Sequence, residues 1–214
     1  MITLGFVFGY LMGDGFFVFF PYLVLGFLFW SFIETVLNEL TVAFPSSAGL
    51  ILETKIPFYT HIFRVLYRNL IIFGHNLILI PILIIFFDLK FSFTIFSLIL
   101  LLFETLIFII AIGGVLAIIS CRYRDMSTLL SNIVRILFYL TPILWNVDMV
   151  KNENILFFIK LNPFYSLINQ FRNIFINGTF DFFQFFSFTT ISLLLLLLSF
   201  VFFGNYKNRI AYWL

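Results

Sequence analysis

Five long stretches of the chain are almost entirely apolar. Each contains at most one Asp, Glu, Lys or Arg, and they occupy 15–33, 69–87, 91–121, 126–147 and 182–206. A helix needs about 20 mostly apolar residues to cross the ~30 Å hydrocarbon core of a bilayer. The pattern therefore predicts five membrane-spanning helices, at about 16–41, 67–87, 93–120, 128–147 and 183–204.

The first residues are apolar but too few to cross a membrane. Residues 1–12 precede the turn-like sequence 13–15. The basic start of a signal peptide is missing, because the first Lys or Arg is Lys55. We interpret 1–12 as the outer half of a first span whose beginning is absent from this chain. The glycines that recur every fourth residue from Gly5 to Gly13 predict a smooth strip for helix packing, with dimerisation as the alternative use.

The segment 148–182 breaks the pattern of spans joined by short loops. Its apolar residues fall on one face of a helix: Phe164, Leu167, Ile168, Phe171, Ile174 and Phe175. Its polar residues fall elsewhere: Ser166, Asn169, Gln170, Arg172, Asn173 and Asn177. This distribution predicts an amphipathic helix that lies in the membrane interface or dips partly into the membrane.

The composition supports a membrane protein. Hydrophobic residues make up 63% of the 214 residues and charged residues 10%, whereas soluble globular proteins carry about 25% charged residues. This excludes a soluble enzyme, a nucleic-acid-binding protein and a disordered chain. We therefore predict an all-α polytopic membrane protein with a single transmembrane domain over 1–214.

Motifs that carry enzyme chemistry are missing from the sequence. No Gly-Lys pair occurs, so the chain has no Walker A loop for nucleotide phosphates. It also lacks a Gly-x-Ser-x-Gly nucleophile elbow, and neither His61 nor His75 has a neighbouring metal ligand. The single cysteine, Cys121, excludes an internal disulfide and a thiolate metal cage. The residues thus predict no catalytic, cofactor-binding or metal site.

The basic residues are distributed unevenly over the loops. Seven lie in or beside the loops 42–66 and 121–127 and the C-terminal tail: Lys55, Arg64, Arg68, Arg122, Arg124, Lys207 and Arg209. Four lie on the other side: Lys90, Lys151, Lys160 and Arg172. The positive-inside rule predicts that the first side is cytoplasmic and that 148–182 lies outside.

Glu104 and Arg135 are charges within predicted spans. Each costs about 2.5–3.5 kcal/mol at the bilayer centre, against a gain of about 0.3–0.6 kcal/mol for each Leu, Ile or Phe. Each indicates either a polar path or ion pair inside the bundle, or a helix shifted so that the charge meets the headgroups. The interior role is the better account of Arg135, and both roles stay open for Glu104.

The loop 47–57 mixes apolar residues with charges of both signs. It predicts a short amphipathic helix over 47–56, because Pro57 disfavours helix at the residue before it. Such a helix rests on the membrane or docks into a groove of a partner protein. The residues alone slightly favour contact of this helix with the membrane over docking into a partner.

Four short motifs follow one another along the chain. They are S-A-G-L-I-L-E-T-K-I-P at 47–57, R-Y-R-D-M at 122–126, T-P-I-L-W at 141–145 and L-N-P-F at 161–164, with Arg172 downstream. Together they resemble the permease subunits of ABC transporters that export polysaccharides, namely O-antigen, capsule and teichoic acid. The resemblance covers nearly the whole chain. It implies a bacterial inner-membrane protein of six spans, the first incomplete here, with short outer helices in 148–182.

The resemblance also implies partners. Two permease copies pair as a homodimer with two separate nucleotide-binding subunits, which hold the ATP and Mg²⁺. This chain would then bind no cofactor itself and would not be an enzyme. The complex would move a lipid-linked polysaccharide through the inner membrane, in contact with membrane lipid and without nucleic acid.

The resemblance and the residue types give three sets of candidate residues. With the resemblance, coupling to the ATPase subunit replaces contact with the membrane as the preferred role of the loop 47–57. The candidate coupling residues are Leu50, Ile51, Glu53, Lys55 and Pro57, with the first two as apolar anchors. The cap at the cytoplasmic start of the fifth span falls on Arg122, Arg124 and Asp125, the last also complementing the exposed amides there. A path in which aromatic rings hold the sugar weakly takes Tyr10, Phe138, Tyr139, Trp145 and Arg135.

Three alternatives stay open. The loop has Leu52, Glu53 and Lys55 where relatives often carry paired basic residues, and the N-terminal portion of the family has no counterpart, so a truncated, inactive remnant is one alternative. A permease of the same fold that exports a drug or a lipid is the second. A membrane-embedded sugar transferase or polymerase is the third, but the loop acids are too scattered to hold a phosphate-linked donor.

Single cysteines introduced by Asn154→Cys and Ser46→Cys test the predicted topology. An impermeant thiol reagent applied to intact cells should label the cysteine at 154, which lies outside, and leave the cysteine at 46 unlabelled. Labelling after permeabilisation is the control for reactivity at both positions. Equal labelling of the two sites in intact cells contradicts the topology.

Overall fold

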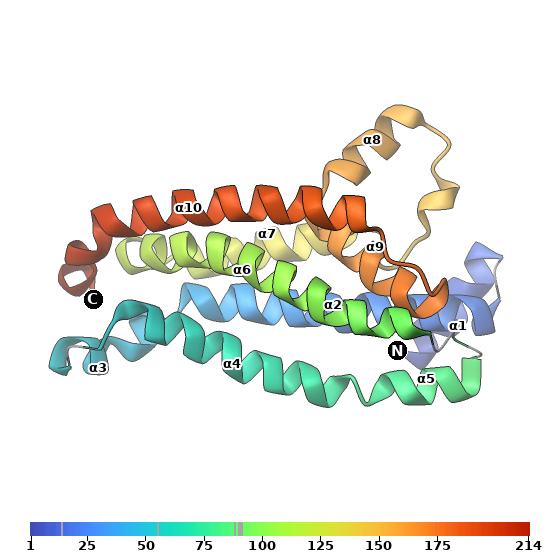
Figure 1. The fold of residues 1–214 in the computed structure, drawn as a ribbon, viewed down its shortest axis with the longest axis horizontal. Helices are drawn as coiled ribbons and strands as arrows, with labels where there is room; N and C mark the ends of the chain where they lie inside the picture. The colour runs from blue at the N-terminus through green and yellow to red at the C-terminus, as the bar shows by residue number, and fades with distance from the viewer. Residues whose placement is uncertain (14, 55, 88, 90–91) are drawn as a thin grey trace. The chain divides into compact units, whose positions relative to one another are not determined.

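In the computed structural model, which describes residues 1–13, 15–54, 56–87, 89 and 92–214, the described part of the chain is helical and contains no strand (Figure 1). The α-helices are α1 Ile2–Met12, α2 Phe16–Thr41, α3 Ala48–Glu53, α4 Phe58–Asn76, α5 Leu79–Phe87, α6 Ser97–Arg122, α7 Met126–Leu140, α8 Glu153–Leu161, α9 Pro163–Ile176 and α10 Phe182–Trp213. Short 3-10 helices are η1 Pro45–Ser47, η2 Phe93–Phe96 and η3 Val147–Met149. The all-α prediction is confirmed.

Four helical stretches of the described chain are long and apolar enough to cross a membrane: Phe16–Thr41, Phe58–Phe87, Phe93–Arg122 and Phe182–Lys207. They correspond to four of the five predicted spans and confirm a polytopic membrane protein. Helix α4 begins at Phe58, before the predicted start of its span at 67. The added turns are amphipathic, with Ile62 and Val65 buried and Arg64 exposed, so the helix extends past the purely apolar run.

Helix α7 is shorter than the span predicted at 128–147. It has 15 residues, which at 1.5 Å per residue is about 22 Å, less than the ~30 Å hydrocarbon core. Pro142 accounts for its end at Leu140, because the residue before a proline disfavours helix. Residues 141–145 form turns and bends, and a membrane crossing that extends to 147 stays a prediction.

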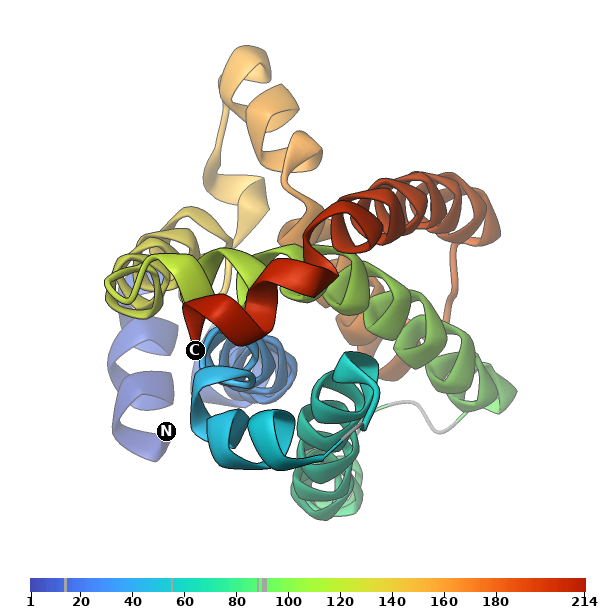
Figure 2. The ribbon, with the colours of Figure 1, turned by 90° about the vertical axis from the view of Figure 1, so that its left-hand side faces the viewer.

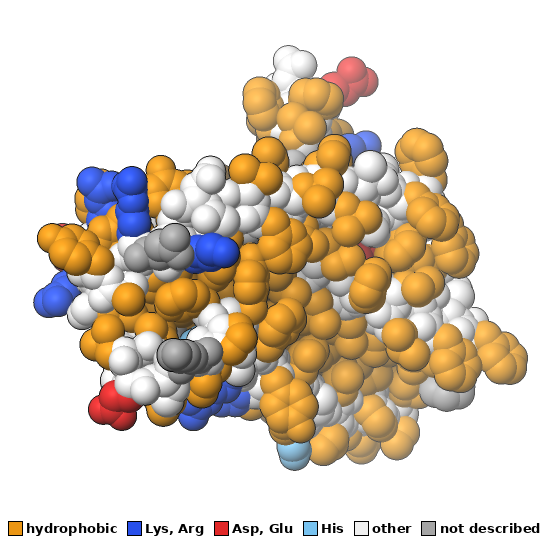
Figure 3. Space-filling model, turned by 60° about the vertical axis from the view of Figure 1, so that its left-hand side comes forward, with side chains coloured by type: hydrophobic (Ala, Val, Ile, Leu, Met, Phe, Trp, Pro, Cys, Tyr) orange, Lys and Arg blue, Asp and Glu red, His pale blue; other side chains and the backbone are white. Residues whose placement is uncertain are grey.

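Apolar side chains cover the surface as well as the core. Figure 3 shows hydrophobic side chains over most of the visible face, and large ones such as Ile85 and Phe183 are 74% and 84% exposed. Soluble monomers rarely expose contiguous apolar patches of more than a few hundred Å². Contact with hydrocarbon removes the cost of such a surface, which agrees with a membrane protein.

The chain folds into two compact units, and several helices contribute residues to both. The first unit comprises 1–31, 74–102 and 135–184, and the second comprises 32–73, 103–134 and 185–214.

Aromatic packing between α2 and α9 forms the core of the first unit. Phe29 stacks on Phe171 with ring centroids 4.6 Å apart, and Trp30 meets Phe164 edge to face at 5.6 Å. Such pairs add about 0.5–1.5 kcal/mol beyond area burial. The whole predicted apolar face of 164–175 is buried. The apolar residues on which the prediction of an amphipathic helix rests therefore also hold this helix against α2.

Helix α1 packs on the start of α2 through its glycines. A Cβ at Gly5 would overlap the ring of Phe20, and a Cβ at Gly9 would lie 3.0 Å from the carbonyl oxygen of Gly15. Gly13 instead adopts a left-handed conformation with φ 80° and ends the helix. Within the first unit, the glycine strip thus serves helix packing.

Helix α8 projects away from α9 in both ribbon views (Figures 1 and 2). The two helices meet at Asn162, whose side chain accepts a hydrogen bond from the Phe164 N–H at 3.0 Å and so caps α9. The same side chain donates to the Thr141 hydroxyl at 3.0 Å. The L-N-P-F motif is thereby tied to the first residue of T-P-I-L-W.

Aromatic pairs also join the helices of the second unit. Tyr59 on α4 packs on Phe203 of α10 at 4.2 Å, and Phe108 on α6 packs on Phe188 of α10 at 5.2 Å. Glu104 on α6 is 0% exposed, and its carboxylate oxygens have no hydrogen-bond partner among the described residues. The structure therefore places Glu104 in the interior of this unit rather than on its surface.

Candidate functional site

A buried arginine joins three segments of the first unit. Arg172 on α9 is 2% exposed. Its guanidinium donates hydrogen bonds from Nε to the Tyr22 carbonyl at 3.0 Å, from Nη1 to the Pro142 carbonyl at 2.7 Å and from Nη2 to the Ile143 carbonyl at 3.2 Å. Burial lowers its pKa to about 10, so the side chain is still charged at neutral pH.

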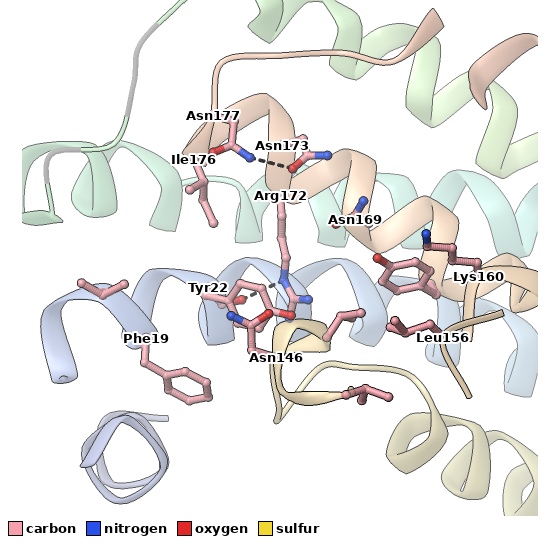
Figure 4. Close-up of a pocket in the computed structure, with 14 residues that line it drawn as sticks. Phe19, Tyr22, Asn146, Leu156, Lys160, Asn169, Arg172, Asn173, Ile176 and Asn177 are labelled. Atoms are coloured by element: carbon pink, nitrogen blue, oxygen red, sulfur yellow. Dashed lines mark hydrogen bonds between the residues drawn. The ribbon is translucent and has the colours of Figure 1, made fainter. Parts of the chain in front are cut away.

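Tyr22 on α2 completes the contact from the opposite side (Figure 4). Its ring lies under the guanidinium, with Arg172 Cζ 3.5 Å from the ring centroid, which is a cation–π contact. Its hydroxyl lies 3.3 Å from the carbonyl oxygens of both Pro142 and Trp145 and can donate to either. Arg172 and Tyr22 therefore bind the same turn.

The turn needs these donors because its backbone is not helical. Carbonyl groups in a helix are satisfied within the helix, whereas those of residues 141–145 have no such ladder. In a low-dielectric environment, an unsatisfied backbone group costs several kcal/mol, and irregular backbone is tolerated only where protein groups satisfy it or where it lines a water-filled cavity. Arg172 and Tyr22 supply donors to the Pro142, Ile143 and Trp145 carbonyls, and so allow α7 to end at Leu140.

Gly26 makes room for the arginine. A Cβ at this position would overlap Nη2 of Arg172 and would lie 2.8 Å from Cζ. Gly26 is one helical turn after Tyr22, so both residues present the same side of α2 to the guanidinium. Any larger residue at 26 would push the arginine off its three carbonyls.

A cavity of about 690 Å³ opens beside Arg172 (Figure 4). Its walls come from α2, the segment after α7, α8 and α9. The described lining includes four asparagines, two tyrosines, Lys160 and Arg172, and no Asp or Glu. The volume falls within the ~300–1,000 Å³ typical of small-molecule sites. The cavity is therefore a polar, cationic site large enough for a ligand.

The predicted path residues do not line this cavity. Tyr10, Tyr139 and Arg135 are exposed, and Phe138 packs on aromatic rings of α2. The Trp145 indole donates to the Tyr139 carbonyl at 3.2 Å. The exposure of Arg135 departs from the expected interior position. A role of the five residues in a transport path stays a prediction.

The predicted cap residues lie where α6 passes into α7 in the second unit. Arg122, Arg124 and Asp125 are exposed. The Arg122 guanidinium lies 5.7 Å from the ring centre of Trp213 on α10. The Asp125 carbonyl accepts the Leu129 N–H at 3.0 Å, so Asp125 stands at the start of α7 as expected. Their role as a gate is untested.

The predicted coupling loop contains the expected short helix, α3. Its bounds, Ala48–Glu53, fall within 47–56. Leu50 is 44% exposed and Leu52 60% exposed, but Ile51 is 8% exposed. Ile51 is thus buried in the free chain, and the exposed large apolar side chains of α3 are Leu50 and Leu52. The pairing of Leu50 with Ile51 as anchors stays a prediction.

The remaining coupling residues flank this helix. Glu53 is exposed and ends α3. Lys55 lies outside the described residues. The Pro57 carbonyl accepts the Thr60 N–H at 3.0 Å, at the start of α4.

The sequence pattern does not reveal the roles of Arg172, Tyr22 and Gly26. It assigns Arg172 to the polar residues of an amphipathic helix, whereas the structure buries Arg172 together with Ser166 and Gln170. A signal was present, because no Asp or Glu occurs between Glu153 and Asp181 to pair with the arginine. A cation in an apolar helix without a nearby acid requires other acceptors, which here are backbone carbonyls.

Gly26→Ala tests the fit of the arginine. We expect a loss of about 1–3 kcal/mol of stability, the usual cost of an overpacked interior, measured as a lower Tm of the detergent-solubilised chain. Gly204→Ala is the matched control, because nothing lies within 4 Å of a Cβ there, and its Tm should be unchanged or slightly higher. Equal Tm values for the two variants would show that Arg172 is not held in this position.

Comparison with known proteins gives matches to one kind of transporter subunit. Over 76 residues the chain is 32% identical to the O-antigen export system permease protein RfbA of Klebsiella pneumoniae, a match that covers 36% of this chain and 29% of that protein. Over 71 residues it is 31% identical to the protein of the same name from Myxococcus xanthus, with 33% of this chain and 27% of that protein covered. The matches thus span less than a third of the length of these curated relatives. No protein-family model matches the chain. The chain is therefore similar, over a third of its length, to permeases of O-antigen export systems.

Proposed function

We propose that this chain is the membrane-spanning subunit of an ATP-driven exporter that moves lipid-linked polysaccharide across the bacterial inner membrane. The observation that carries the proposal is the similarity to O-antigen export permeases, found in a chain with four membrane-length helices. The four ordered motifs extend the likeness beyond the aligned third. Because the sequence has no Walker A loop, ATP is hydrolysed on a separate nucleotide-binding subunit.

Helix α3 is the proposed contact with that subunit. It lies between α2 and α4 along the chain and exposes the apolar side chains of Leu50 and Leu52 beside the acidic Glu53. Covering a Leu side chain contributes about 1.5–3 kcal/mol, so two leucines supply a useful part of a protein–protein contact. Helix α3 is part of the second unit, and its Ile51 is buried there, so a movement of α3 would be passed to the side chains packed around Ile51.

Deletion of the gene tests the export function. We expect cell-surface polysaccharide to fall to background and lipid-linked polysaccharide to accumulate in the inner membrane, with recovery when the gene is restored on a plasmid. The purified chain should hydrolyse no ATP without its partner. Unchanged surface polysaccharide, with altered export of a drug or a lipid, would contradict the proposal in favour of a different cargo.

The double variant Leu50→Asp/Leu52→Asp tests the coupling contact. Both side chains are exposed, so the chain should still fold and insert. Co-purification of the ATPase subunit from detergent-solubilised membranes should be lost, and export with it. The control Leu50→Met/Leu52→Met keeps the apolar surface and should retain both. A double Asp variant that holds the ATPase subunit at the wild-type level and still exports would show that α3 rests on lipid instead.

A further inference from the structure

Among the residues whose side chains the structure describes, no carboxylate lines the cavity beside Arg172. The groups that the structure records in contact with the guanidinium are three neutral carbonyls and the ring of Tyr22. Lys160 adds a second, exposed cation to the described lining, which contains no Asp or Glu. Two cations in a described lining that contains no carboxylate favour an anionic ligand, because the low dielectric of a buried site strengthens their attraction.

The neutral part of the lining is suited to hydroxyl groups. Asn146, Asn169, Asn173 and Asn177 line the cavity, and a carboxamide both donates and accepts hydrogen bonds, as a sugar hydroxyl does. The Asn177 side chain donates to Asn173 Oδ1 at 2.9 Å, so these two amides already form one polar patch on α9. Figure 4 shows Asn169 and Asn173 along α9, and the Arg172 side chain extending from the same helix towards Tyr22 and Asn146.

Aromatic rings provide a surface for the flat, apolar face of a sugar ring. Tyr22 on α2 and Tyr165 on α9 are part of the same lining, as is Phe19, which is 2% exposed and so offers little of its ring. The cavity thus combines cations, amides and rings. An isolated phosphate or carboxylate would interact only with the cations of the lining, and a neutral sugar would interact with the amides and rings but not with the cations.

We propose that this cavity binds an acidic sugar unit, a saccharide that carries a carboxylate or phosphate, within the exported polysaccharide. The proposal rests on the proposed export function, because it names the chemical class of its cargo. Lys160 binds the acidic group, the asparagines bind the hydroxyls, and Arg172 contributes its positive charge while it holds the turn 142–143. On the predicted topology the site lies on the outer side, where the polymer leaves the membrane.

Binding to the purified full chain in neutral phosphatidylcholine nanodiscs tests the proposal. The probes are trigalacturonic acid, which carries three carboxylates, and maltotriose, a neutral trisaccharide of the same length, with calorimetry as the readout. We expect trigalacturonic acid to bind about tenfold or more tightly than maltotriose, since charge-assisted hydrogen bonds are the stronger ones, and its affinity to fall with added salt. Equal affinities for the two probes, or no binding of either, would overturn the proposal.

Two variants and a matched control locate the binding. Lys160→Gln removes the exposed cation and Asn169→Asp adds a negative charge to the lining. Each should weaken trigalacturonic acid binding about tenfold, and Lys160→Gln should leave maltotriose binding unchanged. Lys151→Gln removes another exposed cation of the same segment that is not part of the described lining, and it should bind both probes as the unaltered chain does. A loss of affinity in Lys151→Gln equal to that in Lys160→Gln would show non-specific attraction and overturn the site.

A lipid headgroup is the competing occupant, because phosphatidylglycerol also joins an anion to hydroxyls. Nanodiscs that contain phosphatidylglycerol test whether this lipid occupies the cavity. Retention of that lipid in a Lys160-dependent manner, without saccharide binding in either nanodisc, would assign the cavity to lipid and overturn the proposal. The export function is judged separately by gene deletion. If deletion abolishes surface polysaccharide and the chain binds no acidic saccharide, the export function stands and the acidic-sugar site is wrong.

Discussion

The first unit depends on one requirement, that every buried backbone carbonyl must have a hydrogen-bond donor. The turn that follows α7 leaves the helix at Leu140, and its carbonyls at Pro142, Ile143 and Trp145 accept hydrogen bonds from side chains of other segments. Arg172 supplies three hydrogen bonds at once, two of them to Pro142 and Ile143 and one to Tyr22. The planar guanidinium suits this task better than an ammonium group, because its donors point in fixed directions. The end of α7, the side of α2 and the middle of α9 are therefore held by a single side chain.

This arrangement explains several features that look unrelated in the sequence. Gly26 is small because the guanidinium occupies the space where a Cβ would lie. Tyr22 is aromatic and hydroxylated because its ring faces the cation and its hydroxyl faces the turn. Asn162 ties the turn between α8 and α9 to Thr141. The motifs T-P-I-L-W and L-N-P-F are thus parts of one hydrogen-bonded network, which gives a physical reason for their joint occurrence with Arg172.

Hydrophobic periodicity predicted the long helices and the buried face of α9, because membrane length and helical faces depend on local sequence. Pro142 indicates the end of α7 in the sequence, but the long apolar run that continues to 147 predicts a longer helix. The burial of Ile51 and the exposure of Arg135 depend on packing between distant segments, which a helical pattern does not report. The same holds for Arg172: the pattern assigned it to a polar face, but only the fold brings carbonyls from α2 and from the turn to within hydrogen-bond distance of it.

Neutral carbonyls satisfy the hydrogen-bonding needs of Arg172 without cancelling its charge. A carboxylate in their place would neutralise the guanidinium, whereas neutral carbonyls leave its positive charge in place. Lys160 stands at the same cavity and is exposed, so its charge is partly screened by water and salt. The buried Arg172 therefore provides a positive charge at a fixed position, and the exposed Lys160 provides one on a side chain that can move. In the proposed acidic-sugar site, the fixed charge would orient the acidic unit, and the exposed lysine and the neutral amides would allow its release.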